Sequence, residues 1–559
     1  MNNGVTRDDV LMGVCVPAAC THSDVQQFLA DVFASERNVS LEALLVRVDE
    51  DMCQTQEPFE LDWLDAVFIA IICVLCTMLA VSSTYDVMRA RCKKQKDSEE
   101  KSLWHKIILT FSIPYNFKRL FAFEPSTDGL DCLYGIKSIA MLLIINAHSM
   151  MYVLGGPISN TDFLQWFVQQ PLSAILNSNM LYVETFLFTG AFLLVLHFLK
   201  QLSKNTSVNL IQVFVLRYLR LTPAYALVAL AHATALRWAG AGPLWAARAG
   251  RERARCRASL WANLLYVNNY VATDALCMFQ SWYLAADTQL FAAALVLLWA
   301  LGQRRRARLW ALLALLAVSV GGCFVDALLR RHDPTILMRP KDVEDLPTDD
   351  AFVNAYVKTH LRATSYICGL LLGHWLHDFL ESGRKLSKRV AAACWALAAG
   401  AGLAAVFSVL VFYWPFRAYS RLDSALYAGA VRLAWSACVG WTVFACAAHR
   451  AGPVRRVLSC RALVPLGRLS YCAYLVNGLV GLRGMGAQRT PIHVDALSLI
   501  KAYVSDAVLT YAAALVLSLL IDSPMQALSG LLAGRGRGTK EESNTMQNGT
   551  KFIDNVATK

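Results

Sequence analysis

The segment CLYGIKSIAMLLIINAH, residues 132–148, is a long apolar run that carries two ionisable side chains, Lys137 and His148. Crossing the bilayer core takes about 20 mostly apolar residues in a helix. Eleven segments of the 559-residue chain come close to that length: residues 65–84, 133–153, 181–199, 213–236, 283–302, 308–325, 361–379, 390–413, 425–447, 469–484 and 502–521. We therefore expect an all-α multi-pass membrane protein with about eleven transmembrane helices.

The composition supports this fold class. Hydrophobic residues make up 56% of the chain and charged residues 17%, whereas soluble domains have about 45–50% and about 25%. A disordered chain, a coiled coil, collagen, a small disulfide-rich secreted module and an ordinary cytosolic enzyme are excluded. The net charge of +12 is typical of cationic cytoplasmic loops, so we expect a lipid bilayer and no nucleic acid as partner.

Lysine and arginine gather in loops that an odd number of crossings would place on one side. These are residues 89–106, 304–308, 384–389 and 450–456. The expected orientation has the amino terminus exoplasmic and the carboxyl terminus cytosolic, in the plasma membrane or an endomembrane. One loop dissents, because residues 237–257 hold six arginines on the exoplasmic side.

The expected domains follow from this topology. Residues 1–60 form a small exoplasmic segment containing Cys15, Cys20 and Cys53. Met1 to Leu11 lacks the apolar core of a signal peptide, so either the first span acts as a reverse anchor or the true start is missing. The odd number of cysteines also favours a truncated segment. The span 65–84, a cytosolic linker 85–127, a membrane domain 128–525 and a polar cytosolic tail 526–559 follow.

Glycosylation acceptor motifs provide a check on this orientation. Asn38 lies in one on the exoplasmic side, and Asn205 and Asn548 lie in others on the cytosolic side.

Ionisable groups at membrane depth are functional candidates by default. Lys137 and His148 lie within about 20° of one helix face and about 16 Å apart along the axis. Glu184 and Asp287 are expected at the level of His148, where a carboxylate could orient the imidazole as a general base. The alternatives are snorkelling for Lys137 and an interhelical hydrogen bond for His148.

Arg217 and Arg220 are spaced i, i+3 at the expected cytosolic start of the fourth span. Two guanidinium groups on one helix face can bind phosphate by forked hydrogen bonds, although an ordinary positive flank has the same pattern. The sixteen cysteines show no paired CxxC motifs, so we expect no metal site. Cys256 and Cys277 flank a polar stretch, which makes them disulfide candidates on the exoplasmic side.

Several segments resemble a known family. GVCVPAAC (13–20) resembles the amino-terminal domain of the nose-resistant-to-fluoxetine family of animal membrane proteins. The remainder resembles the acyltransferase 3 fold joined to it there, with ten of the helices in that bundle. The matching segments, in the family's order, are residues 132–148, VETFLFTGAFL (183–193), RYLRLTPAYAL (217–227), residues 256–270, residues 277–291, PLGRLSYCAYLVNG (465–478) and IDSP (521–524).

The resemblance implies an acyltransferase that transfers groups other than amino-acyl groups. Acyl-coenzyme A would be the cytosolic donor, and the acceptor would be a hydroxyl of a lipid, sterol or glycan on the exoplasmic side. Lys137, Arg217 and Arg220 would hold the coenzyme's phosphates, and His148 would deprotonate the acceptor. The resemblance also implies a disulfide between Cys256 and Cys277, and another among the three cysteines before the first span.

The chain departs from the family pattern at four positions. Lys137 stands where arginine is usual, Glu184 where aspartate is, Thr189 where serine is, and Asn477 where histidine is common. The alternative function is therefore a transport or binding protein for lipids or lipophilic small molecules that uses the same fold without catalysis.

Overall fold

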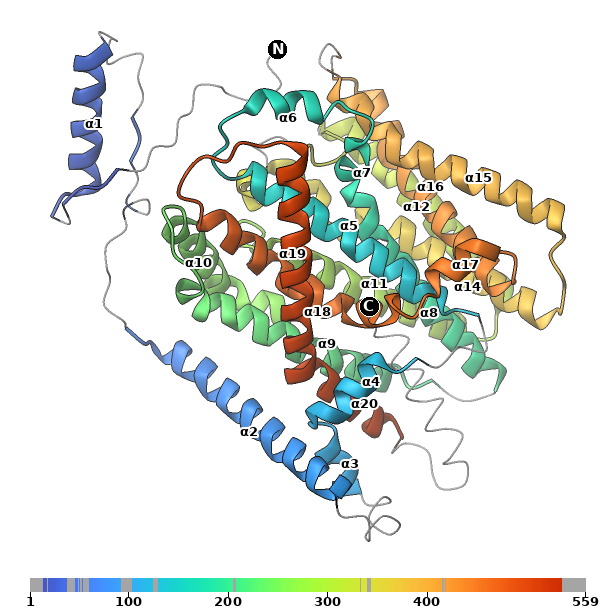
Figure 1. The fold of residues 1–559 in the computed structure, drawn as a ribbon. Helices are drawn as coiled ribbons and strands as arrows, with labels where there is room; N and C mark the ends of the chain where they lie inside the picture. Colours follow the sequence, from blue (N-terminus) through green and yellow to red (C-terminus); the bar gives the residue numbers. More distant parts are fainter. Residues whose placement is uncertain are drawn as a thin grey trace.

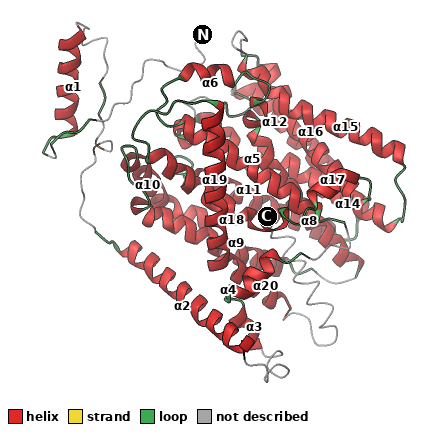
Figure 2. Ribbon diagram, in the orientation of Figure 1, coloured by secondary structure: helices red, strands yellow, loops and turns green. Residues whose placement is uncertain are grey.

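The computed structural model describes residues 14–17, 19–37, 46–48, 50, 53, 60–91, 103–123, 129–204, 208–331, 333–338, 343–414, 417 and 419–534. The described residues form helices with no strand beyond an isolated bridge between Ile158 and Ile492 (Figures 1 and 2). Among them, ten helices are long and apolar enough to cross a membrane. They are α2 (Trp63–Arg91), α5 (Cys132–Leu154), α8 (Asn179–Ser203), α9 (Leu210–Ala233), α11 (Trp282–Leu301), α12 (Arg305–Arg330), α15 (Lys388–Phe407), α16 (Arg421–Ala447), α18 (Leu463–Gly486) and α19 (Ala496–Leu517).

The eleventh expected span is also helical, as α14 (Ala363–Glu381). Its two histidines and Asp378 lower its hydropathy, so it is not among the ten. It packs against α8 and α16 in the centre of the bundle. Gly369 and Gly373 make this possible, since a Cβ at these positions would lie 2.2 Å from the Phe188 carbonyl oxygen and 2.1 Å from Val195 Cγ1.

The remaining helices are shorter or lie at the edges of the bundle. They are α1 (His22–Arg37), α3 (Leu103–Leu109), α4 (Ile113–Phe121), α6 (Thr161–Phe167), α7 (Ser173–Asn177), α10 (Trp245–Leu264), α17 (Gly452–Leu458) and α20 (Ser523–Gly534). Helices α3 and α4 lie within the expected linker and both contact α2. Helix α20 begins the expected polar tail, and the rest of that tail lies outside the described residues.

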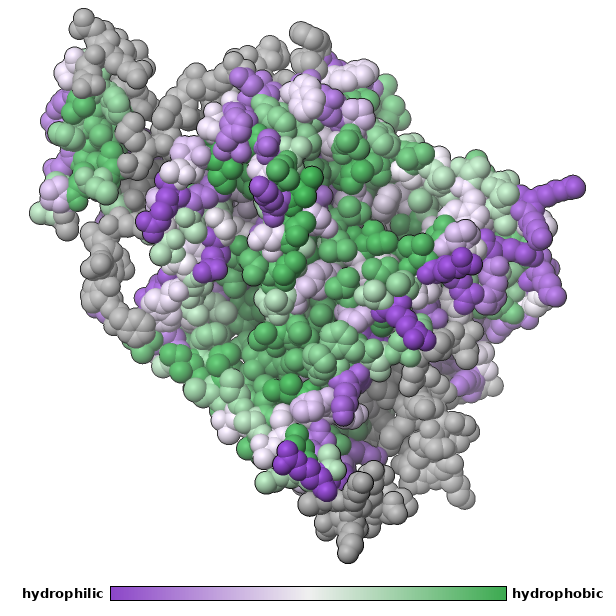
Figure 3. Space-filling view, in the orientation of Figure 1, coloured by the Kyte–Doolittle hydropathy of each residue, from purple (hydrophilic) through white to green (hydrophobic). Residues whose placement is uncertain are grey.

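Burial differs strongly between inner and outer helices. Buried residues make up 89% of the most apolar part of α8 but only 11% of that of α2. Val74, Val81 and Met88 of α2 are exposed although apolar, and apolar residues cover much of the surface shown in Figure 3. An apolar surface of this extent requires lipid around it, so the protein is a multi-pass integral membrane protein.

The dissenting basic loop is helix α10 with the turn before it. Its arginines are paired within the chain: Arg237 with Asp65, Arg253 and Arg257 with Asp62, Arg248 with Glu344, and Arg251 and Arg255 with Asp345. Four carboxylates thus offset six guanidinium groups. The net charge of this part of the structure is therefore lower than the loop sequence alone indicates.

The cysteines follow the expectations only in part. Cys256 and Cys277 form a disulfide, which confirms that pairing. Cys15, Cys20 and Cys53 are free thiols, so the expectation of a second disulfide among these three was wrong for the described structure. The acceptor motifs at Asn38, Asn205 and Asn548 lie outside the described residues.

Candidate functional site

An apolar cavity lies between α5, α8, α11, α18 and residues 336–338 and 343–356, and we call it cavity A. Its wall is mostly aromatic and aliphatic, including Phe279, Trp282, Tyr283 and Tyr356. Apolar pockets of this kind are typical of small-molecule sites, where a few polar groups orient the ligand. His148 is one of those few.

His148 projects from α5 and is half-buried at the wall of cavity A. Its Nδ1 lies 3.0 Å from Oδ1 of Asn477 on α18, and the edge of its ring packs against Phe279 with the ring centroids 5.1 Å apart. An amide oxygen can only accept a hydrogen bond. With the amide in this orientation, Nδ1 carries the proton and Nε2 is the basic nitrogen. Asn477, and not a carboxylate, therefore orients the imidazole.

Glu184 is held by two arginines instead. Its Oε1 accepts hydrogen bonds from Arg362 Nη1 at 2.9 Å and from Arg432 Nε at 3.2 Å. The Arg362 guanidinium stacks 3.8 Å from the Tyr356 ring centroid and lies 5.2 Å from that of Trp282. Both rings line cavity A, so this ion-pair cluster lies directly behind the cavity wall.

Asp287 forms a buried ion pair with Arg217. Arg217 also lies over the Phe291 ring at 4.3 Å. The sequence placed these two residues at opposite membrane levels, and that expectation was wrong, because the ion pair brings them to one level of the bundle.

Lys137 and Arg220 are buried, and their positive charges lie close enough to repel each other. Their side chains, like that of Arg217, do not line cavity A or the adjacent charged cavity described below. The three cations are thus enclosed within the bundle. A phosphate could reach them only after a rearrangement.

A second cavity, which we call cavity B, shares five wall residues with cavity A: Met151, Phe279, Gln280, Val343 and Leu346. The charged and histidine residues in its wall are Arg248, Arg251, Arg255, Glu252, Glu344, Asp345 and His232. Helix α10 supplies four of these. An apolar and a charged cavity therefore meet at one wall.

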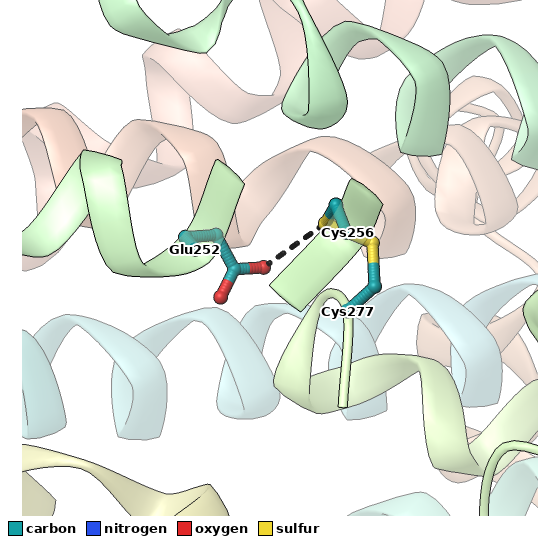
Figure 4. A group of neighbouring side chains, drawn as sticks. All are labelled: Glu252, Cys256 and Cys277. Atoms are coloured by element: carbon teal, nitrogen blue, oxygen red, sulfur yellow. Dashed lines mark hydrogen bonds between the residues drawn. A yellow bond between two sulfur atoms is a disulfide. The ribbon is translucent and has the colours of Figure 1, made fainter. Parts of the chain in front are cut away.

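The disulfide lies next to Glu252, a residue of the cavity B wall (Figure 4). Cys256 in the middle of α10 is bonded to Cys277 before α11, and the neighbouring Glu252 accepts the Met278 backbone N–H at 2.6 Å. Burial raises the pKa of Glu252 above its usual value. Glu252 and the two sulfurs are close enough together to suggest a metal site, but the disulfide uses both sulfurs. The cluster instead fixes the start of the segment that carries Phe279.

The family model for the acyltransferase 3 domain, described as an acyltransferase domain, matches residues 130–522. The chain belongs to this family. It is 25% identical over 555 residues to Nose resistant to fluoxetine protein 6 of Caenorhabditis elegans, across 93% of this chain and 66% of the relative. The chain thus spans slightly less than two thirds of that relative's length. No solved structure matches it.

Sequence reasoning about this acyltransferase 3 protein missed Arg362 and Arg432. Arg432 lies within the expected span 425–447 and Arg362 near the start of the span 361–379, so a charge at membrane depth was the available signal. Asn477 was identified only as a lost histidine. In the structure it is the residue that bonds His148.

Proposed function

We propose that this protein transfers an acyl group from cytosolic acyl-coenzyme A to a hydroxyl of a lipophilic or glycan acceptor on the exoplasmic side. The observation that carries the proposal is the position of His148, whose ring borders an apolar cavity while Asn477 binds its Nδ1. A basic nitrogen beside a space suited to an acyl chain is what ester formation requires.

The proposed reaction is an acyl transfer with one proton acceptor. His148 Nε2 removes the proton from the acceptor hydroxyl, and the oxygen attacks the thioester carbonyl carbon. A carbon–oxygen bond forms and the carbon–sulfur bond breaks, and the coenzyme leaves as a thiolate that takes up the proton from the imidazolium. The products are an ester and free coenzyme A.

Within this proposal the donor's phosphates are bound on the cytosolic side by Lys137 and Arg220. Arg217 is already paired with Asp287. If Arg217 bound a phosphate instead, Asp287 would remain as a buried carboxylate without its partner. We therefore assign Arg217 and Asp287, like Glu184, to holding the bundle around the site. Binding of the donor would have to open the cytosolic side of the bundle.

The orientation remains part of the proposal, with an exoplasmic amino terminus and a cytosolic carboxyl terminus. It predicts glycan on Asn38 and none on Asn205 or Asn548, because only the exoplasmic side is glycosylated. Glycosidase treatment of Asn38→Gln, Asn205→Gln and Asn548→Gln proteins checks this. Glycan on Asn205 would reverse the topology and place His148 on the cytosolic side.

The deciding experiment is an acyl transfer assay on the purified protein, beside His148→Ala. Transfer or hydrolysis of acyl-coenzyme A by the parent, lost in the variant, supports the proposal. Normal transfer by His148→Ala would refute the role of His148 as base. A parent protein that consumes no acyl-coenzyme A of any chain length would refute the enzymatic function.

A second candidate function is transport or binding of lipophilic molecules without chemistry. The enclosure of Lys137, Arg217 and Arg220 favours it, because a protein that binds no coenzyme has no need of an open cationic site. Equal binding of lipophilic ligands by the parent and by His148→Ala, with no transfer by either, would establish this alternative.

A further inference from the structure

We propose that cavities A and B together form one site for an amphiphile, in which cavity B binds an uncharged polar head that carries more than one hydroxyl group. This inference rests on the proposed function, because the head would belong to the acceptor. It narrows the acceptor from any lipid, sterol or glycan to a molecule with an uncharged, multiply hydroxylated head.

The three arginines lining cavity B are already paired with carboxylates. Arg255 binds both Asp345 oxygens, at 2.7 and 2.8 Å, and Arg251 binds one of them at 3.2 Å. Arg248 binds the Glu344 carboxylate at 2.7 Å and its backbone carbonyl at 2.8 Å. Three guanidinium groups are thus paired with two carboxylates, and the third carboxyl group of the lining, Glu252, accepts the Met278 backbone N–H.

Asp345 is ionised in this network. Burial alone would raise its pKa, but the hydrogen bonds and charges of Arg255 and Arg251 hold the pKa below 3.8. A charged ligand head would have to displace one member of these pairs and leave the other without its partner, which is unfavourable in a partly buried site.

Hydroxyl groups meet no such obstacle. A carboxylate has about four acceptor positions and a guanidinium has five N–H donors, so each ion pair has hydrogen-bonding capacity left over. A hydroxyl both donates and accepts, and it can bond to the two partners of a pair at once. His232 adds a further polar group, since its Nδ1 donates to the Val228 carbonyl at 2.8 Å and its Nε2 is therefore an acceptor.

The shared wall explains why a head in cavity B would bring a hydroxyl to the base. Phe279 lines both cavities, and its ring contacts His148 at 5.1 Å and Tyr152 at 6.4 Å between centroids. A sterol, with one hydroxyl on an apolar body, would leave the polar groups of cavity B unused.

The test compares three probes that share one alkyl chain and differ only in the head: a monoacylglycerol, a monoalkyl phosphate and an alkyltrimethylammonium. Binding to the full chain in lipid nanodiscs is measured by native mass spectrometry. We expect the monoacylglycerol to bind about tenfold more tightly than either charged probe, because a hydrogen bond to a charged group contributes about that much.

Asp345→Asn and Arg255→Gln should each abolish this preference. Arg253→Gln is the matched control, since Arg253 is an α10 arginine that pairs with Asp62 outside the cavity B lining. If Asp345→Asn does not fold, Glu344→Gln replaces it, because the Glu344 side chain is 56% exposed. The comparison of probes on the parent protein needs no variant.

Tighter binding of the phosphate probe would make cavity B an anion site and overturn the inference. So would equal binding of all three heads, or an equal loss of preference in Arg253→Gln. These outcomes are independent of turnover. A parent that shows the head preference but transfers no acyl group refutes the proposed function alone, and one that transfers without head preference refutes this inference alone.

Discussion

His148 and Glu184 are ionisable residues on packed helices of the same bundle, and the structure treats them differently. His148 borders a cavity and is bonded to a neutral amide, whereas Glu184 is 1% exposed and lies between two arginines. The first side chain has a nitrogen left for a ligand. The second is held in an ion-pair cluster. Contact with a cavity and the charge of the bonding partner, rather than depth in the membrane, therefore distinguish a reactive side chain from a structural one.

The largest effect is expected from His148→Ala. Loss of a general base should reduce acyl transfer by about a hundredfold to ten-thousandfold, while thermal stability and binding of the acyl donor stay near those of the parent. His197→Ala is the control, since His197 is also on a bundle helix and bonds the Leu193 carbonyl. A similar loss in the control would break the comparison by showing that any bundle histidine is required.

Removing one partner of a buried ion pair should act on stability. Arg217→Met would leave Asp287 buried and charged, and we expect it to lower the free energy of unfolding by about 3–5 kcal/mol. The double variant Arg217→Met, Asp287→Leu should recover most of that loss. Denaturant unfolding in lipid measures both.

The double variant also tests the expectation from the sequence that Arg217 binds the acyl-coenzyme A donor. If the double variant is stable but binds acyl-coenzyme A much more weakly than the parent, Arg217 contacts the donor and its pairing with Asp287 is only a resting arrangement. Unchanged donor affinity would leave Arg217 with the structural role we assign.

A smaller effect is expected from Asn477→Leu. Without the bond to Nδ1, His148 is no longer held in the tautomer that leaves Nε2 basic, and a hydrogen bond of this kind is worth about tenfold in rate. Asn477→His, which introduces the residue common in the family, should retain most of the activity because its ring can also accept a hydrogen bond from Nδ1. Full activity in Asn477→Leu would mean that the cavity alone orients His148.

The sequence predicted the helices better than the contacts between their polar groups. All eleven expected spans are helical, because hydrophobic length is a local property. The partners of the α10 arginines could not be predicted, since Asp62 lies more than 190 residues before Arg253 and Asp345 lies 90 residues after Arg255. The error at Asp287 has the same origin: depth was inferred from distance along a helix, and the contact with Arg217, 70 residues earlier in the chain, could not be predicted.

The smallest effect is expected from a change at Glu252, a carboxylate that can be compared with Glu184. Like Glu184 it is a carboxylate beside a cavity, but it lines cavity B itself, accepts a backbone N–H from Met278, and has no arginine bond among the described contacts. Its pKa is raised chiefly by burial, so the folded state disfavours the ionised form relative to the unfolded chain. Stability should therefore fall as pH rises through the pKa in the folded state, and rise as pH falls toward the usual value of 4.5.

Glu252→Gln keeps an oxygen for the Met278 N–H and cannot ionise, so it should raise the Tm at pH 8 by a few degrees at most, with a smaller gain at pH 5. A gain that is equal at both pH values would show that ionised Glu252 is as well accommodated by the α10 guanidinium groups as Glu184 is by its two arginines.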